Sequence, residues 1–364
     1  MRLEILSRVR SSPPSSEVPA TARPLRSWLL CGIGAVCAIA VVELGLVPLT
    51  TPLNNVWSPI LADRLDGEVR EVRRFTETIA ASHFSLSRAR LTGNPPLSGA
   101  ATGVILGDSH VEAVEVPDRE TMGAIVERSL RSADTRINVR QYGWYGSDVP
   151  KYVQVAPEIT QVWDPVWVVV VITASDLGPD ILTAGVRLVR GTDGHWGVTA
   201  ESAPARIGRA RKIAEQVLSS SGLIYHLAKR GQTAGLPIIR AKNEFGAGKA
   251  SLRPGGIPLP ERTLIALDAL REAYGERLRI LFATDVGIDG LAPESPAENA
   301  VLAACASLGL RCASTRAPMI QDRLDSARLS RGFTNSVPGE GHLNTVGHTL
   351  AAETILRNLV RVRP

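Results

Sequence analysis

The stretch Val166-Trp167-Val168-Val169-Val170-Val171-Ile172 decides the fold class. All seven residues are apolar and most are β-branched, so a strand built from them is hydrophobic on both faces. Such a strand needs a covering layer on each side, which is the environment at the centre of a parallel sheet. The run therefore predicts an α/β protein with this segment as a central strand.

Strand-like and helix-like segments alternate on both sides of this run. The other expected strands are 104–106, 136–140, 277–283 and 310–314, and the expected helices are 119–131, 262–274, 296–308 and 343–360. Five strands alternating with helices predict a doubly wound, flavodoxin-like parallel sheet with right-handed crossovers. Between about 178 and 260 the alternation lapses, and we expect an insertion there, with helical pieces near 207–218 and 222–229.

The N-terminal region differs from the rest of the chain. Residues 1–27 are rich in Ser, Pro and Arg, which predicts a disordered tail. Residues 28–49 are apolar apart from Glu43 and have about the length of a membrane helix. Arginines precede this segment and no Lys or Arg follows before Arg64, so we expect a single-pass signal-anchor with a cytoplasmic N-terminus and a periplasmic or extracellular remainder. A cleaved signal peptide is the alternative, because Ala38-Ile39-Ala40 has the spacing of a cleavage site.

The residues between the expected anchor and the first strand, 50–99, are expected to form a linker and an amphipathic helix over 61–87. A second break at 92–99 precedes a catalytic domain over 100–364. The net charge of +5 is not gathered on one basic face, which disfavours nucleic acid as a partner. Cys305 and Cys312 are close enough in sequence for a disulfide in an oxidising compartment, with two buried thiols as the alternative. No group of residues has metal-ligand spacing, so we expect no metal and no cofactor.

The first expected strand runs directly into Gly107-Asp108-Ser109. Open α/β sheets place their chemistry at the carboxyl ends of their strands, but such a triplet is also an ordinary strand-to-helix turn with a capping residue. Acyl transfer by a serine further requires a base, a group that orients the base, and donors for the oxyanion. His342 lies in a Gly-rich loop before the last helix, two residues after Glu340, and could supply the first two; a helix-capping turn with a surface histidine is the plainer interpretation.

These segments together resemble the SGNH, or GDSL-type, hydrolase family. Gly107-Asp108-Ser109 is similar to the nucleophile block, Tyr142–Asp148 to the glycine block, Ile172–Leu177 to the asparagine block, and His342 to the catalytic histidine. The resemblance covers about residues 100–360 and implies a three-layer sandwich.

In the roles that the resemblance implies, Ser109 is the nucleophile and His342 the base. The oxyanion donors would be the backbone N–H groups of Ser109 and Gly143, or Gly146 if the match is displaced, together with the side chain of Ser175. Ser175 stands where the family usually has asparagine, and its hydroxyl is a shorter donor than an amide.

A second departure concerns the carboxylate, which the family often places three residues before the histidine. That position is Gly339, so Glu340 is the candidate.

The expected function is that of a membrane-anchored, exported serine esterase or O-acyltransferase. The resemblance implies acyl, most simply acetyl, esters of an envelope or extracellular glycan as substrates. Trp144 and Tyr145 could stack on a sugar ring or could fill the core beneath their loop. The alternative is a catalytically impaired module that binds glycan or scaffolds an envelope complex with protein partners, and the replacement at Ser175 is its best support.

Overall fold

The computed structural model describes residues 22–41, 56–58, 69–75, 79–85, 89–144, 146–178, 186–200, 257–290, 292–333, 336 and 338–360. The chain divides into two units, Met1–Thr50 and Thr51–Pro364. In the first unit, α1 (Ala22–Val41) carries exposed apolar side chains such as Trp28. Among the helices of the described residues, none combines the length and the apolar character that crossing a membrane requires. Positions 1–21 and 42–49, which belong to the predicted tail and span, lie outside the described residues.

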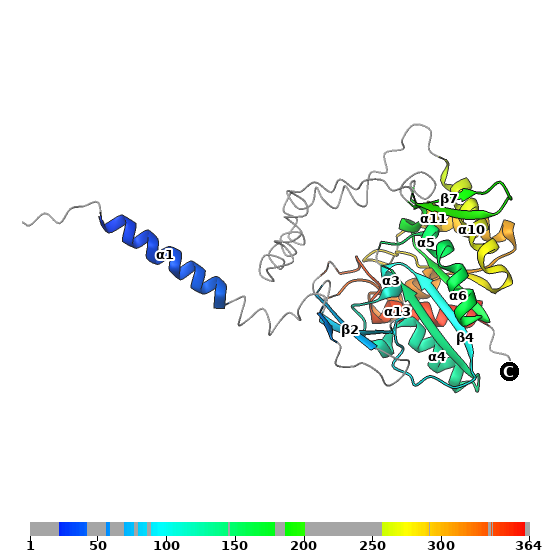
Figure 1. The fold of residues 1–364 in the computed structure, drawn as a ribbon, viewed down its shortest axis with the longest axis horizontal. Helices are drawn as coiled ribbons and strands as arrows, with labels where there is room; N and C mark the ends of the chain where they lie inside the picture. The colour runs from blue at the N-terminus through cyan, green and yellow to red at the C-terminus, as the bar shows by residue number, and fades with distance from the viewer. Residues whose placement is uncertain are drawn as a thin grey trace, which may run out of the picture. The chain divides into compact units, whose positions relative to one another are not determined.

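The second unit is built on a five-stranded parallel sheet (Figure 1). Its strands are β4 (Ala101–Gly107), β5 (Ile137–Gly143), β6 (Trp167–Ile172), β9 (Leu278–Phe282) and β10 (Arg311–Ser314). They lie in the order β10-β9-β6-β4-β5, and all pairings are parallel. Counted along the chain this is the flavodoxin-like order 2-1-3-4-5, so the predicted five-stranded parallel sheet is confirmed. The strand order reverses between β4 and β6, and this switch point places the carboxyl end of β4 where open sheets bind ligands.

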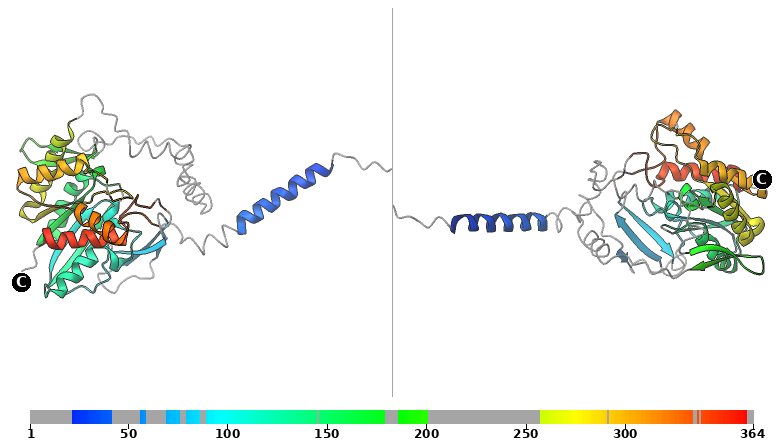
Figure 2. Two further views of the ribbon diagram at one scale, coloured as in Figure 1. Left: turned by 180° about the vertical axis from the view of Figure 1, so that it is seen from behind. Right: turned by 90° about the horizontal axis from the view of Figure 1, so that it is seen from above.

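Helices cover both faces of the sheet because alternate residues of each strand point to opposite sides. The helices on one face are α5 (Val149–Gln154), α6 (Ala156–Trp163), α10 (Leu259–Tyr274) and α11 (Pro296–Leu308). Those on the other are α4 (Met122–Ser132), α12 (Arg316–Ser326) and α13 (Thr345–Thr354), which ends in a π-helical turn (Ile355–Leu359). Figure 2 shows α13, in red, beside α4.

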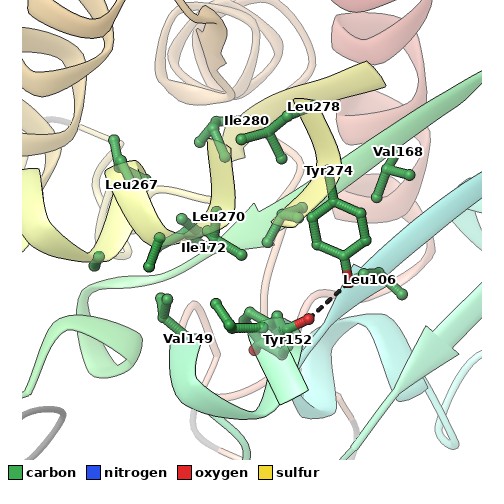
Figure 3. Close-up of a cluster of buried hydrophobic side chains, with 14 of the residues drawn as sticks. Leu106, Val149, Tyr152, Val168, Ile172, Leu267, Leu270, Tyr274, Leu278 and Ile280 are labelled. Carbon is green, nitrogen blue, oxygen red and sulfur yellow. Dashed lines mark hydrogen bonds between the residues drawn. The ribbon is translucent and has the colours of Figure 1, made fainter. Parts of the chain in front are cut away.

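The central strand β6 illustrates why two layers are needed. All of its residues are buried; Val168 and Val170 join the hydrophobic core under α5 and α10, whereas Val169 and Val171 join the core under α4 and α13. Figure 3 shows the first core, in which the Tyr274 hydroxyl donates to the carbonyl of Tyr152 at 2.6 Å. A strand that is apolar on both faces is thus covered by helices on both faces, which gives a three-layer sandwich.

The segment 61–87, expected to be helical, contains strands instead. β2 (Val69–Phe75) and β3 (Ile79–Ser85) pair along their whole length as an antiparallel hairpin, and β1 (Val56–Ser58) pairs with β2. The reason lies in tertiary contacts: Phe84 is buried, and the buried hydroxyl of Ser82 donates to the carbonyl of Val114 at 2.8 Å. A strand that packs on the sheet domain overrides a local helical pattern.

The predicted insertion contains an antiparallel hairpin of β7 (Val186–Arg190) and β8 (Trp196–Ala200). Trp196 donates its indole N–H to Asp268 of α10 at 3.0 Å, which ties the hairpin to the helix layer. The helical pieces expected near 207–218 and 222–229 lie outside the described residues. A disulfide joins Cys305 in α11 to Cys312 in β10, which decides between the two alternatives for these cysteines.

Candidate active site

The turn that follows β4 presents Ser109. β4 ends at Gly107, Asp108 caps the short helix α3 (Ser109–Glu112), and Ser109 is its first residue. The Asp108 carboxylate accepts the backbone N–H of His110 at 2.8 Å, as expected of a capping residue. Burial raises the pKa of Asp108, and that hydrogen bond partly offsets the rise. Asp108 therefore stabilises the turn, and the half-buried Ser109 lies at the carboxyl end of β4.

The structure brings His342 to Ser109 although the two are 233 residues apart in sequence. The distance from His342 Nε2 to Ser109 Oγ is 2.8 Å, which is within hydrogen-bond range. A hydroxyl paired with an imidazole in this way is the arrangement that activates a serine nucleophile. The first two residues of the predicted constellation are thus in contact.

The carboxylate next to the other side of the imidazole is that of Glu115, not that of the predicted Glu340. Glu115 Oε1 lies 3.7 Å from His342 Nδ1, and the Glu115 side chain is only 3% exposed. Glu340 is exposed. Its two neighbours, Gly339 and Gly341, both have positive φ, so the backbone turns sharply on each side of it. The sequence gives little signal for Glu115, because Glu112 stands three residues before it in the same stretch after Ser109.

Gly143 lies at the carboxyl end of β5, where it pairs with Gly107 of β4. A Cβ atom at position 143 would lie 1.8 Å from the backbone nitrogen of Glu112 in α3, so only glycine allows the helix to approach so closely. Gly143 is thereby held against the turn that carries Ser109. Gly146, the fallback candidate, is exposed and has a φ of +69°.

Ser175 follows β6 in a short 3-10 helix (Ala174–Leu177) and is exposed. Its hydroxyl lies 2.6 Å from that of Thr173, and Thr173 in turn donates to Asp176 Oδ2 at 2.6 Å. Either hydroxyl can donate in the Ser175–Thr173 hydrogen bond. The Ser175 hydroxyl is therefore engaged with Thr173 in this structure.

Asp176 is a buried acid below this turn. It accepts the backbone N–H of Thr173 at 2.6 Å and the hydroxyl of Tyr152 at 2.7 Å. Burial, assisted by the nearby Asp108, raises the pKa of Asp176 to about 8. The asparagine-like block is thus supported by a carboxyl group that is largely neutral at pH 7.

Of the two aromatic candidates in the glycine block, the structure describes Trp144. Trp144 is half-buried and stacks on Tyr142 with ring centroids 5.9 Å apart, and it packs against the core under α5 and α10. Lys151 Nζ lies 5.8 Å from the centroid of the Trp144 ring. Tyr145 lies outside the described residues. The structure therefore gives Trp144 a packing role.

Two residues that sequence reasoning did not assign support the loop of His342. The backbone N–H of Leu343 donates to His110 Nδ1 at 3.1 Å, and the rings of His110 and His342 meet edge to face at 5.2 Å. The buried Arg331 donates to the carbonyls of Gly341 at 3.0 Å and Thr284 at 2.9 Å. Burial, together with the charges of Arg331 and His342, holds the pKa of His110 well below its usual range. His110 is therefore a neutral acceptor that fixes the backbone beside the base.

His348, one helical turn into α13, is fully buried and accepts the backbone N–H of Met122 through Nδ1 at 3.1 Å. Burial lowers its pKa to about 3, so it packs as a neutral side chain. Within the described residues there is no group of three or more His, Cys, Asp or Glu side chains that could hold a metal ion.

No protein-family model and no curated protein matches the chain. Similar solved structures include a two-domain esterase active on acetylated mannans, with 10% identity, a TM-score of 0.39 and coverage of 70% of this chain and 48% of that one. A member of the lipolytic G-D-S-L family from Veillonella parvula has 11% identity, a TM-score of 0.36 and coverage of 70% and 96%. An acetyl xylan esterase from Geobacillus stearothermophilus has 16% identity, a TM-score of 0.37 and coverage of 73% and 99%.

The chain spans about half the length of the first of these structures.

Proposed function

We propose that the chain is a serine esterase of the SGNH type. The observation that carries the proposal is the 2.8 Å contact between Ser109 Oγ and His342 Nε2 at the switch point of a flavodoxin-like sheet. Motifs in the order nucleophile, glycine, asparagine-like and histidine block accompany that contact. Hydroxyl, imidazole and a strand-end turn are the parts that acyl transfer requires.

In the proposed reaction Ser109 Oγ attacks the ester carbonyl carbon while its proton passes to His342 Nε2. The backbone N–H groups of Ser109 and Gly143 are the proposed donors to the oxyanion that forms. The tetrahedral intermediate collapses, the alcohol leaves with the proton from His342, and the acyl group stays on Ser109. Water, deprotonated by His342, then attacks the acyl-enzyme; the bond to Ser109 Oγ breaks, His342 returns the proton to that oxygen, and the acid is released. A sugar hydroxyl in place of water would give acyl transfer.

The test uses the full chain and p-nitrophenyl acetate. Ser109→Ala should lower kcat by at least ~10⁴-fold, because loss of the nucleophile removes the covalent route. Ser98→Ala, at an exposed serine away from the site, should leave kcat unchanged. Release of p-nitrophenol at the original rate by Ser109→Ala would contradict the proposal.

The acyl group and acceptor that we propose are acetyl and an envelope or extracellular glycan, as the family resemblance implies. Acetylated glycan should lose acetate on incubation with the full chain, measured by acetate release. A labelled acetyl group that instead appears on an added oligosaccharide would identify the protein as an O-acyltransferase. No release and no transfer, with activity on p-nitrophenyl acetate intact, would exclude this substrate class.

A non-catalytic module that binds glycan or scaffolds an envelope complex is the second candidate. It is favoured by one observation, the engagement of the Ser175 hydroxyl with Thr173 where the family usually has asparagine. A fluorophosphonate probe separates the two functions, because only an activated serine reacts with it. Labelling of Ser109 supports the esterase, and an unlabelled, folded protein supports the module.

Export and membrane anchoring are proposed for the same protein. Support comes from the arginines before residue 28, the absence of Lys and Arg between it and Arg64, and the Cys305–Cys312 disulfide, since disulfides persist in oxidising compartments. The full chain should stay in the membrane pellet after an alkaline wash and should be degraded by protease added outside the cytoplasmic membrane. Recovery in the soluble cytoplasmic fraction would refute the anchor.

A further inference from the structure

The imidazole of His342 has two polar neighbours on opposite ring nitrogens. Nε2 faces the Ser109 hydroxyl, and Nδ1 lies 3.7 Å from Glu115 Oε1. This second distance exceeds that of a hydrogen bond, but catalytic hydrogen bonds are often long before substrate binds and tighten in the complex. The imidazole thus lies between a hydroxyl and a buried carboxylate, as in a catalytic triad.

The backbone around Glu115 is a tight turn at the end of α3. Ala113 has a φ of 51°, a left-handed conformation that is uncommon for a residue with a side chain. Ala113 N–H donates to the Ser109 carbonyl at 3.0 Å, and Val116 N–H donates to the Ala113 carbonyl at 3.1 Å. A strained turn of this kind persists only where surrounding contacts hold it. The contacts that do so come from a segment earlier in the chain.

Arg90 supplies most of these contacts. Its side chain is fully buried, and Nη1 donates to the carbonyls of Ala113 at 3.0 Å and Glu112 at 3.3 Å, while Nη2 donates to that of Val116. The backbone of Arg90 is fixed as well, because its N–H donates to the carbonyl of Gln141 in β5 at 2.7 Å. The Arg90 guanidinium therefore donates hydrogen bonds to the backbone on both sides of Glu115, while the backbone of Arg90 is itself hydrogen-bonded to β5.

The charge of Arg90 is balanced inside the protein. Asp118 Oδ1 lies 3.0 Å from Nη2, and the same oxygen accepts the backbone N–H of His83 in β3 at 3.1 Å. Burial lowers the pKa of Arg90, whereas Asp118 foremost, with Glu115 and Glu112, opposes that shift. The hairpin, Arg90 and the Glu115 turn are thus one polar network, although sequence reasoning placed 50–99 outside the catalytic domain.

We propose that Glu115 orients His342 and stabilises its protonated form, and that Arg90 is a positioning residue that holds the Glu115 turn. This inference rests on the proposed esterase function. Asp108, His110 and His348 also interact electrostatically with His342. None of these three offers an acidic group to Nδ1: Asp108 caps α3, and the two histidines are held neutral by burial.

The first experiment compares Glu115→Gln with wild type in the full chain on p-nitrophenyl acetate. The variant keeps the size of the side chain and should lower kcat by about 10²–10⁴-fold with little change in KM, because the imidazole loses its orienting carboxylate. The acidic limb of the kcat/KM pH profile should move to lower pH, since the imidazolium loses a neighbouring negative charge. Glu115→Asp should recover part of kcat and return the acidic limb of the kcat/KM pH profile to its wild-type position. Circular dichroism establishes that each variant is folded.

Arg90→Lys tests the positioning role. It keeps the charge but cannot reach several carbonyls at once, so kcat should fall about 10-fold or more and the acidic limb should shift in the same direction as in Glu115→Gln. Glu158→Gln, at an exposed residue on α6, is the matched control for Glu115→Gln and should have the kcat and pH profile of wild type. A purely structural role of Arg90 would lower thermal stability without moving the pH limb, and that result would overturn the positioning role.

Two outcomes overturn the role of Glu115 while leaving the esterase function intact. One is a Glu115→Gln variant within about 3-fold of wild type with the wild-type pH profile, while Ser109→Ala is inactive. The other is loss of activity in Glu340→Gln but not in Glu115→Gln, which would assign the role to Glu340. Retention of full activity by Ser109→Ala would instead overturn the esterase function and this inference together.

Discussion

The turn that carries Ser109 and the loop that carries His342 are held by different kinds of contact. Ser109 follows β4, which has a parallel strand on each side, and Trp144 N–H adds a backbone hydrogen bond to the Gly107 carbonyl at 3.1 Å. The histidine loop is held by a short backbone bridge around Arg331 and Leu343, in which Gly332 N–H donates to the His342 carbonyl at 3.0 Å, and by the side chains of Arg331 and His110. The nucleophile thus follows an inner strand of the sheet, whereas the base lies in a loop whose short backbone bridge is reinforced by side chains.

This difference between the Ser109 turn and the His342 loop indicates where single substitutions should act. A turn that continues an inner strand changes only when something is forced into it, whereas a loop that depends partly on side chains is loosened when one of them is removed. Amide hydrogen exchange should show the same difference, with Leu343 exchanging faster than Leu106 in the middle of the sheet.

The largest effect is expected when the nucleophile turn is forced apart by Gly143→Ala. The new Cβ would lie 1.8 Å from the backbone nitrogen of Glu112, so α3 must move and Ser109 with it. We expect a loss of about 3 kcal/mol in the free energy of unfolding from overpacking, and a fall of at least ~10²-fold in kcat from the displaced oxyanion donor. Denaturant unfolding and steady-state kinetics measure the two effects.

Gly197→Ala is the matched control for Gly143→Ala, because a Cβ at position 197 meets no atom within 4 Å. It should change stability by only a few tenths of a kcal/mol and leave kcat unaltered. A Gly143→Ala protein as stable and active as wild type would show that the nucleophile turn yields easily, contrary to the comparison.

The second effect is expected on the other side of the site, from Arg331→Met. The variant removes the donor to the Gly341 carbonyl and to the buried carbonyls of Thr284 and Ala283, at a cost of about 1–3 kcal/mol for each buried one that stays unsatisfied. We expect kcat to fall about 10²-fold and hydrogen exchange to quicken in the histidine loop but not in β4. Arg311→Met, at an exposed arginine in β10, is the control. Uniform faster exchange throughout the domain would contradict a local role.

The same difference explains which parts of the site could be predicted from sequence. Ser109, Gly143 and His342 stand at strand ends or in glycine-rich loops, where backbone geometry restricts the residue types and leaves a recognisable pattern. The parallel sheet was predicted because strands and helices alternate along the chain. Glu115 could not be found in this way, because its position depends on the left-handed turn at Ala113 and on contacts from Arg90, which lie in different segments.

The hairpin of β2 and β3 was predicted wrongly as a helix for a related reason. Its charged sequence fits a helical period as well as a strand, and the choice is made by partners elsewhere in the chain. Ser82 donates to Val114, and His83 donates to Asp118. Contacts between distant segments of this kind carry no local pattern that a single sequence shows.

A third effect, on stability alone, concerns its pH dependence. Burial raises the pKa of Asp176 to about 8, whereas an unfolded aspartate titrates near ~3.9. Between about pH 4 and 8 the folded state holds a proton that the unfolded state releases, so stability should fall as pH rises through this window. Asp176→Asn should flatten the dependence of the urea midpoint on pH, and Asp134→Asn, at an exposed residue, should not. An unchanged slope in Asp176→Asn would assign the proton uptake to another group.

The smallest effect is expected from Ser175→Ala. The Ser175 hydroxyl is hydrogen-bonded to Thr173, which in turn contacts Asp176, and is therefore already engaged in this structure. Its removal should therefore lower kcat by no more than about 3-fold, well below the loss of about 10²–10³-fold typical of a missing oxyanion donor. Ser175→Asn introduces an amide whose N–H groups reach further, so turnover should be preserved or should rise. A loss of 10²-fold or more in Ser175→Ala would mean that the hydroxyl leaves Thr173 when substrate binds, and the donor set would then include a side chain as well as the backbone of Ser109 and Gly143.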